Sequence, residues 1–159
     1  DVFPTVLIAA LVLPLLWSCF VRLEAAGLAR TSTRDRLLLV AALGFGSVFY
    51  FSAVQGKVWY TAHVVGVALA LAYLWASIEA ARPLLAGVLL GLAAVTRTPL
   101  AFMFPLFLCE AWRMAGGAAA WSSDRRAMIR ALASRGLRFA APPADPAGGR
   151  VRLQHRRSR

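Results

Sequence analysis

The chain has 159 residues, 60% of them hydrophobic, and a formal net charge of +11. Apolar blocks near the length of a bilayer crossing exclude an ordinary soluble domain and predict an all-α, polytopic membrane protein. The charge is uneven, since residues 113–159 hold eleven arginines and two aspartates, and this pattern indicates membrane orientation rather than nucleic-acid binding.

Three apolar runs are long enough to be full transmembrane helices, and they cover about residues 4–21, 37–54 and 59–78. Pro14 lies inside the first run and predicts a kink there. Only the turn at 55–58 separates the second and third runs, so we expect these two runs to form a tight antiparallel hairpin.

The arginines predict the orientation of these spans. The connection at 22–36 carries four arginines and is therefore expected to be cytoplasmic. The turn at 55–58 then lies outside, and the turn at 79–83 lies inside.

A fourth apolar run, residues 83–112, contains a lone arginine, Arg97, in its middle. As one helix this run would be about 45 Å long at 1.5 Å per residue, which exceeds the roughly 30 Å hydrocarbon core. A break at Thr96–Pro99 resolves the excess by giving two short helices, 83–95 and 99–112. These predict a broken or re-entrant hairpin with Arg97 at its outer tip, and Thr98 and Pro99 there are typical of a helix start.

Two interpretations of Arg97 remain open. It is either an interfacial arginine whose charge reaches water, or the centre of an anion site. In the second case its guanidinium, Thr98 and the new helix start would bind a phosphate group. Lys57, on the same side, is assigned to this phosphate site.

Other polar residues near the turn at 55–58 also have two interpretations. Gln55, Tyr60 and His63 are either an interfacial belt or the polar wall of a head-group pocket. Tyr60 and His63 are three residues apart and are expected to share a helix face. No second histidine is near His63 in the sequence, so no metal site is predicted.

Two further features are expected to be structural. Gly87 and Gly91, in a G-V-L-L-G pattern, predict a close-packing helix face. Acidic residues at the ends of the apolar runs are expected to form interfacial ion pairs with neighbouring arginines: Glu79 and Glu110 with Arg82 and Arg113.

The C-terminal part divides in two. Residues 113–140 are predicted to be a basic cytoplasmic segment, with an amphipathic helix at 122–140 on the anionic inner leaflet. Residues 141–159 lack apolar periodicity and are predicted to be a disordered, arginine-rich tail.

The stretch "LLAGVLLGLAAVTRTPLAFMFPLFL" resembles a motif of bacterial GT-C glycosyltransferases, such as mannosyl- and aminoarabinosyltransferases. A glycine-spaced helix is followed by Thr–Arg–x–Pro and an apolar return helix, and the resemblance covers about residues 1–112. It implies a bacterial inner-membrane enzyme that transfers a sugar from a polyprenyl-phosphate donor to an extracytoplasmic acceptor. It also places Arg97 near the lipid-linked phosphate.

The resemblance leaves the catalytic residues unknown. The family's catalytic carboxylate belongs to an external loop that should precede the first visible span, so the chain is expected to be a fragment. A divalent metal occurs in some relatives, but no ligand set is visible in this sequence. Two alternatives are a transporter or flippase fragment, and a non-catalytic membrane scaffold whose basic tail binds membrane lipids.

Overall fold

A computed structural model describes residues 2–117 and 125–140, and within these ranges the chain is helical and has no strand. The longer elements are the α-helices, and two short 3-10 helices lie between them. In chain order they are α1 (Val2–Ala25), α2 (Thr33–Gly46), α3 (Val48–Gln55), α4 (Val58–Ser77), η1 (Ile78–Ala80), α5 (Pro83–Thr96), η2 (Thr98–Met103), α6 (Phe104–Met114) and α8 (Arg125–Ala140).

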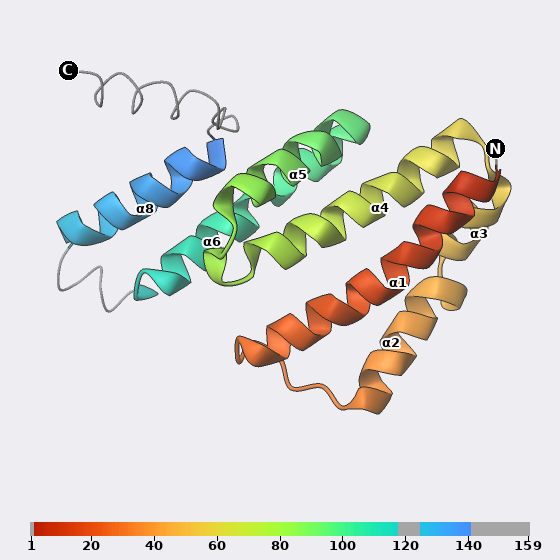
Figure 1. Ribbon diagram of the computed structural model, residues 1–159, viewed down its shortest axis with the longest axis horizontal. Helices are drawn as coiled ribbons and strands as arrows, with labels where there is room; N and C mark the ends of the chain where they lie inside the picture. The colour runs from red at the N-terminus through yellow and green to blue at the C-terminus, as the bar shows by residue number, and fades with distance from the viewer. Residues whose placement is uncertain (1, 118–124, 141–159) are drawn as a thin grey trace, which may run out of the picture.

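The helices form an elongated bundle in which α4 lies between α1 and α5 (Figure 1). The helix α3 packs against α1 and α4, and α8 packs against α5 and α6. One end of the bundle holds the start of α1, the α3–α4 turn and the α5–η2 connection, and we name it the Arg97 end. The opposite end holds the α1–α2 connection, the α4–α5 turn and the end of α6, and we name it the Arg22 end.

Two helices are long and apolar enough to cross a membrane: α1, which continues through Pro14 as one helix, and the segment Val58–Ala80. The pair α2 and α3 is a third candidate if it counts as one span, although the two helices are bent by 50°. Length and composition thus identify two to three candidate spans within the described residues.

The predicted span at 37–54 is not one continuous helix, because the helix breaks at Ser47. The Ser47 backbone is extended, and its hydroxyl accepts a hydrogen bond from the Phe49 N–H at 3.1 Å, which starts α3 as an N-cap. The helix α2 also starts earlier than predicted, at Thr33. Ser32 and Asp35 form a capping box there that satisfies the first backbone N–H groups.

Tyr73 holds the hairpin of α5, η2 and α6 against α4. Its side chain is fully buried, and its hydroxyl donates to the Met103 carbonyl at 3.0 Å and accepts from the Phe107 N–H at 3.2 Å. Lipid tails are as apolar as the helices, so burial of apolar surface contributes little to helix association in a bilayer. Hydrogen bonds of this kind and close packing therefore carry more of the association.

Glu110 closes the hairpin at the Arg22 end. Its carboxylate accepts from the Glu79 N–H at 2.8 Å and forms an ion pair with Arg113 at 2.8 Å. The expected pair of Glu110 with Arg113 is therefore present, whereas Glu79 and Arg82 form no ion pair in the described chain. Glu79 instead contributes its backbone, and its φ of 61° lies in the left-handed region.

Gly87 allows α8 to approach α5 closely. A Cβ at this position would lie 1.9 Å from the Phe139 carbonyl oxygen, whereas one at Gly91 would meet nothing within 4 Å. The Phe139 ring stacks on Phe107 with centroids 4.5 Å apart, and Arg135 donates to a carbonyl of α6 at 3.2 Å. The predicted amphipathic helix thus packs on the hairpin through one face, and the predicted disordered tail at 141–159 lies outside the described residues.

Candidate functional site

Arg97 lies at the break between α5 and η2. Its N–H still bonds to the Ala93 carbonyl at 2.8 Å, but its own backbone is extended, with φ −148° and ψ 109°. The prediction that Thr98 caps the next helix is wrong, because Arg97 occupies the cap position and no side chain caps η2. Thr98 is instead the first residue of η2 and is exposed, and Pro99 follows it in the first turn, as expected.

The Arg97 side chain crosses to α4. Its Nη1 atom lies 2.6 Å from His63 Nδ1. Its aliphatic stem passes over Gly66, where a Cβ would lie 3.4 Å from Arg97 Cδ and 3.2 Å from Leu100 Cδ1. Gly66 is buried and lacks a side chain, so it leaves the space that this stem occupies.

The contact with Arg97 sets the hydrogen-bond roles of the two side chains. A guanidinium can only donate hydrogen bonds, so His63 Nδ1 is the acceptor, which requires the tautomer with its proton on Nε2. His63 therefore orients the Arg97 guanidinium without neutralising its charge.

The Arg97 charge has no carboxylate partner among the residues that the structure describes. Ion pairs in that part of the chain join Glu24 to Arg36 and Glu110 to Arg113, both at the opposite end. A guanidinium has five N–H donors in a planar fork, and the Arg97 side chain is largely exposed. Donors therefore remain that can bind an anion such as a phosphate.

A groove of about 400 Å³ opens at the Arg97 end between α1, α4 and the end of α5. Thr5 and Thr61 both belong to its lining, and their hydroxyl groups are hydrogen-bonded to each other at 2.9 Å. Thr96, the neighbour of Arg97, also contributes to the wall. The remaining lining residues are apolar or glycine: Pro4, Gly56, Val58, Ala62 and Val65.

The other predicted site residues are less closely connected to Arg97. Lys57 is exposed and precedes α4, and Gln55 is the half-buried last residue of α3. Tyr60 packs edge-on against Phe51 of α3, with centroids 5.5 Å apart, and so faces a different neighbour from His63. The structure thus brings His63 to Arg97 and directs Tyr60 elsewhere.

Sequence reasoning missed Gly66 and the threonines of the groove. Thr5 and Thr61 are polar residues inside apolar runs, and Gly66 interrupts a run of larger side chains. Such residues often mark polar contacts or close approach between membrane helices. Their pairing across α1, α4 and α5 depends on helix rotation, which the sequence pattern alone does not provide.

The described residues contain no group of three or more His, Cys, Asp or Glu side chains that could hold a metal ion. Comparison with known proteins covered protein-family models, curated proteins and solved structures, and nothing matches the chain in any of the three. The function is therefore inferred from the residues of the chain itself, chiefly from Arg97.

Proposed function

We propose that this chain is part of a membrane glycosyltransferase and that its Arg97 end binds the phosphate of a polyprenyl-phosphate-linked sugar. One observation supports this most: Arg97 is held by His63 and Gly66, has no described carboxylate partner, and lies beside a groove at the end of apolar helices. The proposal places the Arg22 end in the cytoplasm of a bacterium and the Arg97 end outside, because arginines are concentrated at the Arg22 end.

The chemistry of Arg97 favours a phosphate ligand. The planar guanidinium matches two phosphate oxygens, and a charge-assisted hydrogen bond is stronger where water is partly excluded. His63 occupies one N–H and fixes the direction of the others. Lys57 in the neighbouring turn adds a second positive charge at this end.

The groove suits the rest of such a donor. Its apolar walls, which include Val58 and Val65, can contact the first isoprenyl units of the lipid. The hydroxyls of Thr61 and Thr96 lie at the same end as Arg97. Thr96 donates its proton to the Leu92 carbonyl and Thr61 bonds to Thr5, so the free lone pairs of these oxygens can accept hydrogen bonds from sugar hydroxyls. A lipid that carries a phosphate between an apolar chain and a sugar would satisfy both kinds of contact.

In the proposed reaction, an acceptor hydroxyl attacks the anomeric carbon, and the bond from that carbon to the phosphate oxygen breaks. The polyprenyl phosphate leaves with the electron pair, and a carboxylate of the intact enzyme takes the hydroxyl proton. Negative charge grows on the phosphate as the sugar departs. A cation at Arg97 therefore stabilises the transition state more than the bound donor.

Binding of polyprenyl phosphate to the chain in nanodiscs tests the proposal. Loss of a charged hydrogen bond costs about 1.5–3 kcal/mol, so Arg97→Gln should weaken binding by roughly 10- to 150-fold. Arg97→Lys should recover part of the affinity, because a point charge remains. Arg30→Gln, at an exposed arginine of the opposite end, is the matched control. Equal affinity of Arg97→Gln and the original chain would contradict the proposal.

A transporter remains the second candidate, because a charged residue at a break between two short helices is also typical of transporter binding sites. The two candidate functions differ in whether binding requires the apolar chain of the ligand. A donor site needs the apolar chain, so a water-soluble sugar phosphate should bind far more weakly than the polyprenyl form. Equal binding of the two ligands would favour the transporter.

A further inference from the structure

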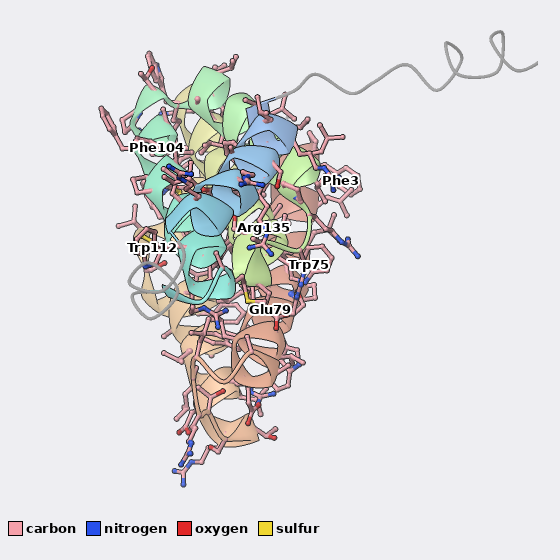
Figure 2. All side chains as sticks on the ribbon, turned by 90° about the vertical axis from the view of Figure 1, so that its left-hand side faces the viewer. Phe3, Trp75, Glu79, Phe104, Trp112 and Arg135 are labelled. Atoms are coloured by element: carbon pink, nitrogen blue, oxygen red, sulfur yellow. The ribbon has the colours of Figure 1, made fainter. Side chains whose placement is uncertain are left out.

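A second group of basic side chains converges at the Arg22 end, away from the proposed donor site. Arg22 near the end of α1 and Arg82 in the turn before α5 both place their guanidinium carbon 4.5 Å from the centre of the Trp75 ring. Arg22 Nη1 also donates to the Trp75 carbonyl at 2.8 Å. Figure 2 shows Trp75 at this end, close to Glu79.

The two arginines are held near each other without a carboxylate between them. Because both lie 4.5 Å from one ring centre, their guanidinium carbons are separated by no more than twice that distance. In the part of the chain that the structure describes, neither takes part in an ion pair. Glu79, four residues after Trp75, uses its N–H to bind Glu110 and pairs with neither arginine.

Other features of this corner also favour an anion. The helix α5 begins at Pro83, directly after Arg82, and no side chain caps its N-terminus. The partial positive charge of that helix end adds to the two guanidinium charges. The Trp75 ring is half-buried and keeps both guanidinium groups in place, while Arg82 remains exposed to an approaching ligand.

We propose that Arg22, Trp75 and Arg82 form a binding site for the phosphodiester of an anionic membrane lipid, in the leaflet at the Arg22 end. The site lies where candidate spans α1 and Val58–Ala80 both end, which is the depth of lipid head groups. Basic pockets between helices at this depth bind phospholipid head groups. A lipid is favoured over a soluble phosphate because exposed apolar side chains, Leu84 and Leu85, follow Arg82 directly in the first turn of α5.

The association of spin-labelled lipids with the full chain in bilayers tests this site. The measurement gives the association constant of phosphatidylglycerol relative to phosphatidylcholine. Each arginine near a membrane surface contributes about 1 kcal/mol, so Arg22→Gln or Arg82→Gln should lower the preference about fivefold and the double variant about 25-fold. Arg34→Gln removes an exposed arginine of the same end without these contacts, so it measures the general effect of one surface charge and should lower the preference less than either site variant.

Further variants and a competition measurement complete the test. Trp75→Phe keeps an aromatic ring and should retain most of the preference, whereas Trp75→Leu should lose much of it. Arg97→Gln should lower the preference much less than the double variant does, which separates this site from the proposed donor site. An unchanged preference in the folded double variant would overturn the proposal. Equal displacement of the labelled lipid by millimolar glycerol phosphate would show a soluble-phosphate site instead.

Discussion

At the scale of single residues, Gly66 determines how closely Arg97 can approach α4. The arginine stem and Leu100 both lie where a Cβ of residue 66 would project. A Cβ there would touch the arginine stem at 3.4–3.6 Å, an ordinary contact distance, and would crowd Leu100 at 3.2 Å. The position of Arg97 over α4 is therefore sensitive to a residue that carries no polar group.

Gly66→Ala should shift Leu100 of η2 and, with it, the neighbouring Arg97 side chain, which weakens the bond to His63. The new methyl group would lie 3.2 Å from Leu100 Cδ1, closer than most packed contacts, and 3.4–3.6 Å from the Arg97 stem, which is ordinary van der Waals contact. We expect affinity for polyprenyl phosphate to fall several-fold with little change in thermal stability, since flexible side chains can move aside. Nitrogen NMR of labelled histidine should show a proton fixed on His63 Nε2 in the original chain and a mixture of tautomers in the variant.

Gly91→Ala is the matched control for this prediction. Its methyl group would meet nothing within 4 Å, and alanine is the better helix former. The control should keep both the affinity and the NMR signal of the original chain. A Gly66→Ala variant that behaves in the same way would refute the positioning role of Gly66.

The sequence predicted the importance of Arg97, because an isolated charge in an apolar run is costly and needs a reason. It predicted His63 only as one of several wall residues. Tyr60 and His63 are three positions apart, which leaves them on adjacent parts of the α4 surface. That difference is enough to direct Tyr60 to α3 and His63 to α5.

At the scale of elements, the hairpin depends on contacts at its base as well as at its tip. Glu110 joins the end of α6 to the α4–α5 turn and is only 9% exposed. Glu79 and Ala80 both have positive φ, at 61° and 49°, which costs non-glycine residues free energy. The bond from Glu79 to Glu110 helps to offset this cost.

Substitutions at the two glutamates should change stability in opposite directions. Glu110→Ala removes a charged acceptor from the Glu79 N–H and from Arg113, so the free energy of unfolding should fall by about 1.5–3 kcal/mol. Glu79→Gly keeps the N–H that bonds to Glu110 and removes the cost of a positive φ at a non-glycine residue. The free energy of unfolding should therefore rise by up to about 1 kcal/mol. Unfolding of the chain in mixed micelles measures both changes. Stabilisation by Glu110→Ala would show that the bonds of Glu110 to Glu79 and Arg113 do not stabilise the fold.

The break at Arg97 could be expected from sequence, whereas the break at Ser47 was not. The run at 83–112 is too long for one crossing and contains a proline, so a break had to occur there. The run at 37–54 has the right length, and its only local signals are Gly44, Gly46 and Ser47. Serine and glycine are tolerated inside membrane helices, so the N-cap at Ser47 depends on how α3 packs against α1 and α4.

At the scale of the whole molecule, the basic residues within residues 2–117 divide between the two ends of the bundle that Figure 1 shows. The Arg97 end has Lys57 and Arg97. The Arg22 end has six arginines: Arg22, Arg30, Arg34, Arg36, Arg82 and Arg113. This asymmetry predicts that the Arg22 end stays on the cytoplasmic side, because arginine-rich connections are not readily moved across the membrane.

Single cysteines at Thr33 and Gln55 test the orientation and the number of spans together, in a background from which Cys19 and Cys109 have been removed. These positions lie at opposite ends of the bent pair α2 and α3. If the pair crosses the membrane, an impermeant thiol reagent should label Gln55→Cys in intact cells and Thr33→Cys only after permeabilisation. The reverse pattern would invert the orientation and place Arg97 on the cytoplasmic side. Arg97 could then not take part in an extracytoplasmic transfer reaction. If both positions are labelled from the same side, α2 and α3 form a re-entrant loop that enters and leaves the membrane on that side. Only α1 and the segment Val58–Ala80 would then remain as full spans.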